Sequence, residues 1–194
     1  MKEKNTVIEK LVEVSNFLKD NHLNLKILIW WYKLFMTKNF INVVVAGATG
    51  YVGLDLVYLL SKHKKVKIIN LCAQKNIGKQ IKNFDKRIKK KLPKISKINK
   101  VNWQKIDLLF LSLPNGEAQK IVKNLYFKYH NLKFIDLSAD FRINSIKLYE
   151  QYYGQHKNPN YIKKFAYGLT ELNKTNIKKS LNIACPGCYP TSIL

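Results

Sequence analysis

The sequence predicts an α/β protein built on a doubly wound parallel sheet, and three observations support this prediction. A valine-rich apolar segment at residues 41–47 runs directly into closely spaced glycines. Short apolar segments of the same kind recur at residues 66–72, 107–114 and 133–140. Between the first two segments and after the third, the apolar residues have helical spacing. Strands that alternate with helices in this way form parallel sheets with helices on both faces.

Length and composition are those of one folded domain in a reducing compartment. At 194 residues the chain can hold an ordinary domain and part of a second. Hydrophobic residues make up 46% of it, which argues against wholesale disorder. The three cysteines, Cys72, Cys185 and Cys188, are too few and too unevenly placed for a disulfide scaffold. Since no convincing export signal accompanies them, a cytoplasmic protein is expected.

The charge is strongly basic, +23 from 35 basic and 12 acidic residues, which raises the question of nucleic-acid binding. Arg87 and Arg142 are the only arginines, and the remaining basic residues are lysines in a background rich in Asn and Ile. Arginine is the better residue for bidentate recognition of phosphates and bases. We therefore expect solvated lysine faces and no nucleic-acid partner.

Residues 1–35 do not have the pattern of a domain. They include an apolar stretch at residues 23–35, which Lys26 and Lys33 interrupt. This stretch is shorter than the about 20 apolar residues of a membrane span, and no small-residue cleavage site follows it. We expect no membrane partner and interpret residues 1–35 as an amphipathic or non-native extension, with Met36 as a hypothetical translation start.

The first strand is predicted at residues 41–47, because a nearly continuous apolar run is typical of a strand buried on both faces. Gly47, Gly50 and Gly53 follow in a G-x-x-G-x-x-G spacing. A helix is predicted next. Its apolar positions are Val52, Leu56, Leu59 and Leu60. Together with the second strand at residues 66–72, these elements make one βαβ unit.

Glycines at such a turn allow a pyrophosphate to approach the backbone and the helix N-terminus, whose free N–H groups and dipole attract anions. A tight structural turn is the alternative interpretation of the same glycines. The spacing between a buried strand and an amphipathic helix favours a Rossmann-type fold that binds a dinucleotide. The candidate cofactor-binding residues of this turn are Gly47, Thr49, Gly50, Tyr51, Val52 and Gly53.

The end of the second strand indicates which dinucleotide is bound. NAD-specific sites usually carry an acidic residue there, which holds the ribose 2′-hydroxyl. Residues 72–79 read CAQKNIGK, with no acid and with Lys75 and Lys79. NADP is therefore the predicted cofactor, with Lys75 as a contact for its 2′-phosphate. Pro114, where the strand at residues 107–114 ends, is the remaining candidate cofactor contact.

The later elements follow the same logic. A helix is predicted from about Glu117 to Tyr126, between the strands at residues 107–114 and 133–140, and a last short strand at residues 181–185. The lysine-rich segment at residues 82–103 has no persuasive periodicity, so no element is predicted within it.

Six motifs occur in the order of a known family: VVAGATGYVG, FLSLPNGEAQ, FIDLSADFR, YEQYYGQHKNP, YGLTELN and ACPGCYPT. Together they resemble the N-terminal part of N-acetyl-gamma-glutamyl-phosphate reductase, the NADPH-dependent family of arginine biosynthesis. IDLSADFR and PGCYPT are far more specific than the glycine turn. The resemblance covers residues 41–194.

The resemblance implies an oxidoreductase that reduces a small acyl phosphate, N-acetyl-gamma-glutamyl phosphate, to a semialdehyde with release of phosphate. The family is similar in plan to aspartate-semialdehyde dehydrogenase. A related reductase of lysine biosynthesis acts on a carrier-bound aminoadipyl phosphate, and that substrate stays open here. At full length, the resemblance implies a homo-oligomer.

The resemblance assigns the catalytic nucleophile to Cys188, the cysteine of PGCYPT. Its thiolate would attack the acyl phosphate, expel phosphate and leave a thioester, which hydride from NADPH reduces to the aldehyde. Pro190 favours the first turn of a helix that begins near Cys188. Helix N-termini favour the thiolate form of cysteine, and their N–H groups can stabilise an oxyanion.

Cys185 stands where many relatives have Asn. It is either a redox partner of Cys188 or a small, half-buried neighbour at a turn. No metal site is predicted, because zinc needs two further ligands at suitable spacing and the nearest candidate, His156, belongs to another motif. A structural hydrogen-bonding role is expected for His156.

We expect three parts: residues 1–35 as the extension, 36–184 as the dinucleotide-binding domain and, as the resemblance implies, 185–194 as the opening of an α+β substrate domain. In relatives that domain supplies the catalytic histidine, so this chain is expected to be a truncated fragment with little or no turnover. A stand-alone NADP-binding module without catalysis is the alternative. Relatives also commonly have Ser-Arg for the 2′-phosphate where this chain has Ala73 and Gln74.

Overall fold

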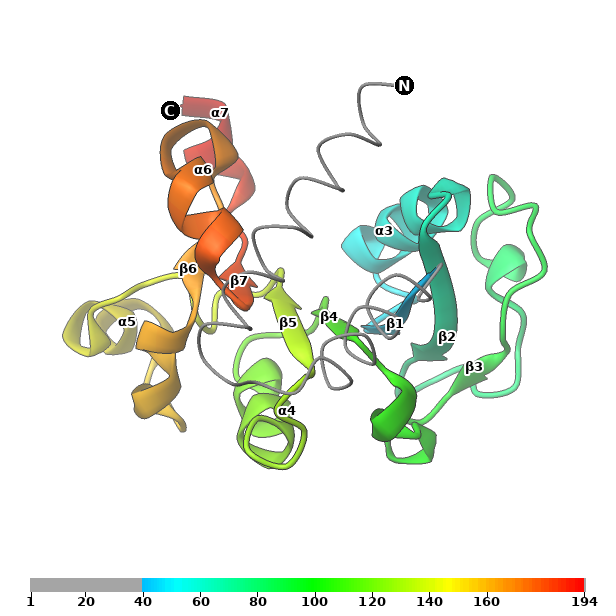
Figure 1. Ribbon diagram of the computed structural model, residues 1–194, viewed down its shortest axis with the longest axis horizontal. Helices are drawn as coiled ribbons and strands as arrows, with labels where there is room; N and C mark the ends of the chain where they lie inside the picture. Colours follow the sequence, from blue (N-terminus) through cyan, green and yellow to red (C-terminus); the bar gives the residue numbers. More distant parts are fainter. Residues whose placement is uncertain (1–39, 194) are drawn as a thin grey trace, which may run out of the picture. The chain divides into compact units, whose positions relative to one another are not determined.

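A seven-stranded sheet organises residues 40–193, the part of the chain that the computed structural model describes (Figure 1). The strands are β1 (Ile41–Ala46), β2 (Val66–Cys72), β3 (Ile95–Ser96), β4 (Leu108–Leu111), β5 (Lys133–Asp136), β6 (Ala166–Tyr167) and β7 (Asn182–Ala184). The α-helices are α3 (Tyr51–Lys62), α4 (Glu117–Leu125), α5 (Ile146–Tyr153), α6 (Thr170–Lys179) and α7 (Cys188–Ile193). Short 3₁₀ helices are η1 (Ile81–Asn83), η2 (Ile98–Lys100), η3 (Trp103–Lys105) and η4 (Pro159–Lys164).

The strands lie in the order β3-β2-β1-β4-β5-β7-β6, and every adjacent pair is parallel. The chain builds outward from β1 to β2 and β3, and then returns to build from β4 in the other direction. This arrangement confirms the predicted doubly wound topology. The direction reverses between β1 and β4, and folds of this kind bind ligands at the carboxyl ends of the strands near that point.

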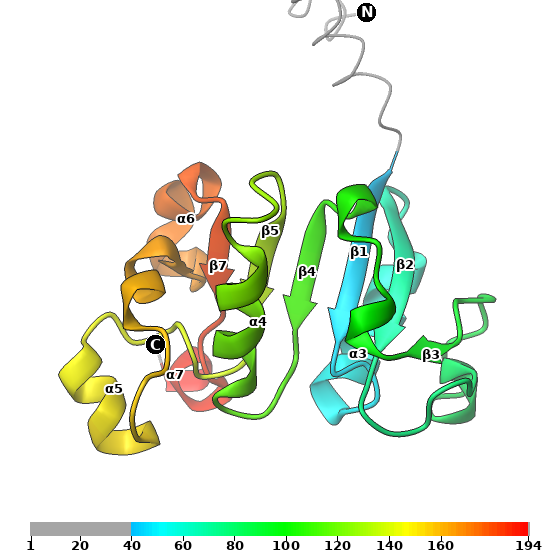
Figure 2. The same cartoon turned by 90° about the horizontal axis from the view of Figure 1, so that it is seen from below.

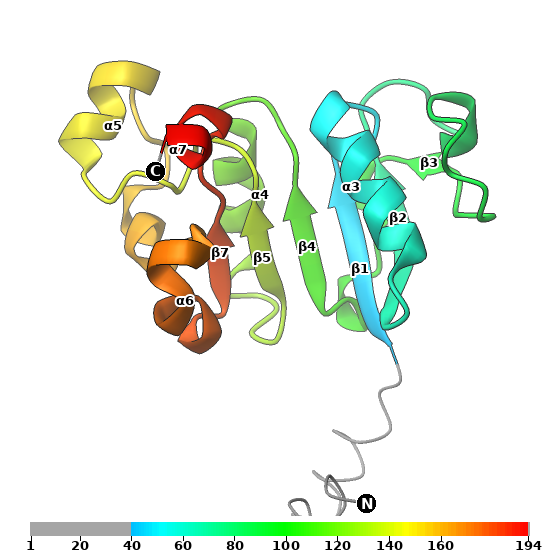
Figure 3. The ribbon, with the colours of Figure 1, turned by 90° about the horizontal axis from the view of Figure 1, so that it is seen from above.

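Helices cover both faces of the sheet. α3 packs on β1 and β2, while α4 lies on the opposite face (Figures 2 and 3). The arrowheads of β1, β4, β5 and β7 point the same way, so the turn before α3, the turn before α4, and α7 lie at one end of the sheet (Figure 3). Function in this fold is therefore expected at that end.

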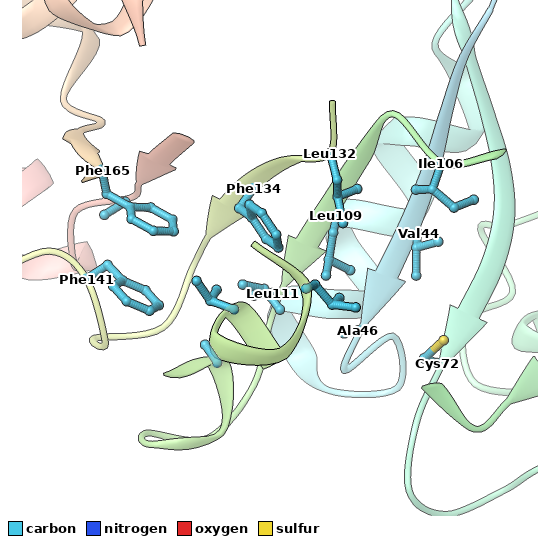
Figure 4. Packing of buried hydrophobic residues seen from close by; sticks show 14 of the residues in the cluster. Val44, Ala46, Cys72, Ile106, Leu109, Leu111, Leu132, Phe134, Phe141 and Phe165 are labelled. Carbon is cyan, nitrogen blue, oxygen red and sulfur yellow. The ribbon is translucent and has the colours of Figure 1, made fainter. Parts of the chain in front are cut away.

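Two apolar clusters, one on each face, form the core. Alternate residues of β1 supply both: Val43 and Val45 belong to one cluster, and Val44 and Ala46 belong to the other. The first cluster includes Val57 of α3, and the second includes Val122 of α4. Figure 4 shows the second cluster extending from Cys72 on β2 to Phe165. The prediction that β1 is buried on both faces is confirmed.

The predicted apolar face of α3 is wrong in part. The helix itself is confirmed, but Val52 and Leu59 are exposed, and its buried residues are Gly53 and Val57. A Cβ on Gly53 would lie 2.1 Å from the backbone oxygen of Gly47, so the missing side chain lets the helix approach the turn closely. This close approach decides which side of α3 meets the sheet, and the leucine spacing alone does not reveal it.

Sequence reasoning also missed β3. This strand lies within residues 82–103, where no element was expected, and it pairs with the end of β2. A strand of only two residues has no periodicity to detect, so its position depends on the pairing that β2 offers. The segment after β3 is thereby placed beside the segment after β2.

The predictions for residues 1–35 and for Met36 fall outside the described residues. The boundaries at 36–184 and 185–194 stay predictions. Between residues 40 and 193, no helix combines the length and the apolar character that crossing a membrane requires.

Candidate active site

A cavity of about 800 Å³ opens where β1, β2 and β4 end. Its wall is formed by the turn after β1, the segments after β2 and β3, and the turn between β4 and α4. This is the end of the sheet at which the strand order reverses. The cavity therefore has the position expected of a dinucleotide site.

The glycine turn forms one wall of this cavity. Gly47 has φ +82°, and a Cβ there would lie 1.8 Å from the backbone oxygen of Ser112. Gly50 differs, because its φ is −77° and the nearest atom to a Cβ would be 3.5 Å away. Close packing against backbone atoms therefore requires glycine at positions 47 and 53. At position 50, glycine leaves the start of α3 open to a ligand.

The structure brings most of the predicted cofactor contacts together. The lining of the cavity includes Gly47, Thr49, Gly50, Lys75 and Pro114. Tyr51, Val52 and Gly53 do not line it. Tyr51 is 94% exposed at the first position of α3. Gly53 packs against the backbone of the turn and therefore supports the turn without lining the cavity.

Charge is distributed unevenly around the cavity. Lys97, which sequence reasoning did not single out, lines it together with Lys75. Glu117 is the acidic residue of the lining, and it forms an ion pair with Lys120 at 2.5 Å. Glu117 begins α4, after β4, whereas the two lysines follow β2 and β3. The positive and negative sides of the cavity are thus separated by β1 in the sheet.

A second cavity, of about 620 Å³, contains Cys188. Cys188 is the first residue of α7 and is exposed, and Figure 3 shows α7 beyond the tip of β7. Thr191 closes the first turn, since its backbone N–H and its Oγ1 both donate to the backbone oxygen of Gly187, at 3.2 and 2.8 Å. The predicted helix start at Cys188 is confirmed.

Arg142 is a functional candidate that sequence reasoning missed as a site residue. It lines the Cys188 cavity, and its Nη2 donates to the backbone oxygens of Leu137 and Ser138, at 3.2 and 2.5 Å. Its Nη1 lies 2.9 Å from where a Cβ on Gly187 would be. The buried Nε makes no hydrogen bond within residues 40–193. The guanidinium is therefore fixed beside the turn that carries Cys188. Its place in the specific motif FIDLSADFR was the available signal.

Cys185 lies in a different environment from Cys188. Its backbone N–H donates to the backbone oxygen of Asp136 at 2.7 Å, which joins the cysteine segment to the end of β5. The pKa of the Cys185 thiol is raised to about 11, chiefly by burial and also by the charge of Asp136, while the charge of Arg142 acts in the opposite direction. Cys185 is therefore a protonated, half-buried neighbour at neutral pH and a poor nucleophile.

Asp136 is itself perturbed. It is fully buried at the end of β5, and burial raises the pKa of its carboxyl to about 6. Hydrogen bonds from the backbone N–H and the Oγ of Ser138, at 3.0 and 2.7 Å, act in the opposite direction. Sequence reasoning gave no role to this residue, because only the fold shows that it lies behind the cysteine segment.

Asp140 connects the two cavities. Its buried carboxylate accepts hydrogen bonds from the backbone N–H groups of Gly116 and Gln119, at 2.8 and 3.2 Å, and from the Gln119 side chain at 3.1 Å. The hydroxyl of Tyr149 lies 3.1 Å from the same carboxylate. Gly116 is next to the cavity-lining segment of the first site, and Asp140 is two residues from Arg142 in the second. The carboxylate of Asp140 thus connects the turn beside the first cavity to the loop that carries Arg142 in the second.

His156 has the hydrogen-bonding role expected of it. Its Nδ1 accepts from the backbone N–H of Asn158 at 3.0 Å. The proton therefore resides on Nε2, which donates to the backbone oxygen of Asp140 at 2.8 Å. His156 is buried and belongs to the scaffold that supports Asp140. Among residues 40–193, no group of three or more His, Cys, Asp or Glu is arranged to hold a metal ion.

The parallel sheet, the glycine turn and the cavity at the reversal point define a Rossmann-type dinucleotide-binding domain. One family model, described as the NAD-binding domain of semialdehyde dehydrogenase, matches residues 42–180. The chain belongs to this family.

Curated relatives are named N-acetyl-gamma-glutamyl-phosphate reductase. The protein of Ehrlichia canis is 48% identical over 157 residues, which cover 79% of this chain and 44% of the relative. A probable chloroplastic reductase of Arabidopsis thaliana is 37% identical over 155 residues, covering 79% of this chain and 38% of the relative. The chain thus spans less than half the length of these relatives.

Solved structures share the fold. Aspartate semialdehyde dehydrogenase II of Vibrio cholerae has a TM-score of 0.56 and 19% identity, over 80% of this chain and 44% of that one. The aspartate semialdehyde dehydrogenase of Candida albicans, solved with NADP, has a TM-score of 0.50 and 16% identity, over 78% of this chain and 44% of that one. These similarities confirm the predicted fold class.

Proposed function

We propose that this chain forms the cofactor-binding and cysteine-bearing part of an NADPH-dependent reductase that converts N-acetyl-gamma-glutamyl phosphate to its semialdehyde. The observation that carries the proposal is the position of Cys188. It lies in a cavity with Arg142, at the same end of the sheet as the glycine turn. The names of the curated relatives support the choice of substrate.

The chemistry of the chain's own residues begins at Cys188. Its thiolate attacks the carbonyl carbon of the acyl phosphate, the bond to the phosphate oxygen breaks, and a thioester and free phosphate result. NADPH, when bound, supplies the hydride that reduces the thioester, and the thiolate then leaves as the aldehyde forms. Arg142 is placed to hold the phosphate or the developing oxyanion, because its guanidinium is fixed beside the cysteine turn.

The cofactor-binding part of the proposal rests on the first cavity. Gly47, Thr49 and Gly50 line this cavity, and Gly50 leaves the start of α3, where the first N–H groups have no partner within the helix, open to a pyrophosphate. The end of β2 has no acid to hold a 2′-hydroxyl, and lysines line that side of the cavity. Together these features favour NADP over NAD.

Little or no turnover is expected from this chain alone. Within residues 40–193, no histidine lines the Cys188 cavity, which supports this expectation. The free thiols of Cys72, Cys185 and Cys188 fit the cytoplasmic location that we propose.

The test separates acylation from turnover. The chain is incubated with N-acetyl-gamma-glutamyl phosphate, and its intact mass is compared with that of Cys188→Ser. We expect the mass of one acyl group on Cys188 in the parent chain and none in the variant. A parallel incubation uses carrier-bound aminoadipyl phosphate, and acylation by that substrate alone would redirect the proposal to the lysine pathway. Absence of acylation with both substrates, combined with NADPH binding, would leave a cofactor-binding module instead.

The reverse reaction gives the second measurement. Purified chain is mixed with N-acetylglutamate semialdehyde, NADP and phosphate, and NADPH formation is followed by absorbance. We expect no rate above that of Cys188→Ser. A clear phosphate-dependent rate would contradict the expectation of little or no turnover.

A further inference from the structure

We propose that Lys97, together with Lys75, binds the 2′-phosphate of NADPH and sets the preference for NADPH over NADH. This inference rests on the proposed cofactor function and assigns a specificity-determining residue within it. Both lysines line the first cavity. Lys97 comes from the segment after β3, an element that the sequence does not reveal.

The strand register brings Lys97 to the position where cofactor specificity is decided. β2 and β3 are parallel, with Leu71 opposite Ile95 and Cys72 opposite Ser96. The next residue along each strand is Ala73 and Lys97, so these two leave the sheet side by side. The residue at the end of the second strand of a Rossmann fold faces the adenosine ribose. Lys97 therefore stands beside the ribose position, although it lies 24 residues from Ala73 in the chain.

The first two residues after β2 carry no charge that could attract a phosphate, and the first cationic residue is Lys75. Ala73 and Gln74 both line the cavity, and neither carries a charge. A phosphate in this position needs a cationic partner from elsewhere, because an anion removed from water without one is costly. Lys75 supplies one cation, and Lys97 supplies a second from the adjacent strand.

Backbone hydrogen bonds fix the two segments relative to each other. The N–H of Ala73 donates to the backbone oxygen of Ser96 at 3.2 Å. Farther along, the N–H of Gly78 donates to Ile95, and the N–H of Ile95 donates to Lys79, at 2.8 and 3.0 Å. These bonds hold the loop after β2 against β3 at both of its ends. The spacing between the lysine-bearing backbones is therefore set before any cofactor binds.

A third lysine reinforces the positive side of the cavity. Nζ of Lys79 donates to Oδ1 of Asn76 at 3.1 Å, and Asn76 lines the cavity. The acidic residue of the lining, Glu117, lies on the far side of β1 and is paired with Lys120. No carboxylate of the described lining therefore competes with a 2′-phosphate at the end of β2.

The experiment compares cofactor binding by the parent chain, Lys97→Ala, Lys75→Ala and a control, Lys94→Ala. Lys94 is exposed, directly precedes β3 and does not line the cavity, so the control removes the same charge from the other flank of the same strand. Dissociation constants for NADPH, NADH and 2′,5′-ADP are measured by calorimetry or by nicotinamide fluorescence. Circular dichroism and thermal unfolding establish that every variant is folded.

We expect Lys97→Ala to weaken NADPH and 2′,5′-ADP binding by about tenfold, the size of one lost charge-assisted hydrogen bond, and to change NADH binding by less than about twofold. Lys75→Ala should act in the same direction, and Lys94→Ala should change none of the three constants. Equal NADPH weakening in Lys94→Ala and Lys97→Ala would overturn the inference, because it would indicate a general field effect.

The failures of the two proposals are distinguishable. If the parent chain binds neither NADPH nor NADH, the proposed cofactor function fails. If it binds both and the ratio of their dissociation constants is the same in Lys97→Ala as in the parent, only the assignment of Lys97 fails. Binding at higher ionic strength adds a check, since the contribution of the 2′-phosphate should decrease with salt more in the parent than in Lys97→Ala.

Discussion

Cys185 and Cys188 lie only three residues apart, yet the fold gives them opposite properties. Cys188 is exposed at the start of α7, in a cavity with Arg142. Cys185 is half-buried behind it, and burial raises the pKa of its thiol to about 11. Cys72 is buried on β2, where burial also raises its thiol pKa to about 11. These differences favour a single reactive nucleophile over a redox pair.

This contrast predicts selective alkylation. Under native conditions at about pH 8, iodoacetamide should modify Cys188 first, because the thiolate is the reacting form and the other two thiols are less accessible and protonated. Peptide mass spectrometry measures the modified fraction of each cysteine against time. The Cys188→Ser variant should stay unmodified over the same period, and all three cysteines of the parent should react in denaturant. Equal native rates at Cys185 and Cys188 would contradict the assignment.

At the scale of single elements, the turn between β1 and α3 shows that its glycines have different tasks. Gly47 has a positive φ and lies against the backbone of Ser112. Gly53 sits where α3 crosses the turn. Gly50, in contrast, has ordinary backbone angles, and a Cβ there would make only an ordinary van der Waals contact, 3.5 Å from the backbone oxygen of Gly47. The three glycines form one motif, but only at Gly50 can a substitution change ligand binding without also disrupting the packing of the turn.

Gly47→Ala and Gly50→Ala form a matched pair that tests this division. We expect Gly47→Ala to lower the free energy of unfolding by at least about 2 kcal/mol, because it adds strain at positive φ and a clash with backbone. Gly50→Ala should cost no more than about 1 kcal/mol but should weaken NADPH binding. Urea unfolding and cofactor titration measure the two effects. Similar stability losses in both variants would contradict the proposed roles.

At the scale of the whole molecule, buried carboxylates join the two cavities to the sheet. Asp140 ties the turn before α4 to the loop that carries Arg142. Asp136 lies at the end of β5, where the backbone of Cys185 meets it. The cofactor and cysteine cavities therefore rest on the same central strands, and a change at one carboxylate affects the stability of the fold as a whole.

Asp136 gives that stability a definite dependence on pH. Its pKa is about 6 when folded and 3.8 as the reference value, so the folded state holds this proton more tightly than the unfolded chain. The resulting contribution favours folding at low pH and is lost as the pH rises from about 4 through about 6, on the order of 2 to 3 kcal/mol in all. The Asp136→Asn variant has no titrating carboxyl at this position, so its free energy of unfolding lacks this pH-dependent contribution.

The measurement is urea unfolding of both proteins between pH 4 and pH 7. The free energy of unfolding of the parent minus that of Asp136→Asn should decrease as the pH rises. The difference cancels the titration of the other carboxylates, which both proteins share. A difference that is constant, or that increases with pH, would contradict the raised pKa.

The sequence by itself determined the fold class and the glycine turn, and it predicted which cysteine is the nucleophile. Continuous apolar runs identify strands that are buried on both faces, and the spacing of glycines reports a local backbone requirement. The motif PGCYPT singled out Cys188 by resemblance. Each of these signals is contained in a few neighbouring residues, so no knowledge of the remaining chain is needed to detect it.

Tertiary structure alone decided which distant residues share a site. The pairing of β3 with β2 places Lys97 beside Ala73, and the loop after β5 places Arg142 against Gly187. It also set the orientation of α3, whose leucine spacing suggested a different buried face. The physical reason is the same in each case: proximity across a sheet depends on strand order and register, which arise from packing between segments far apart in the chain.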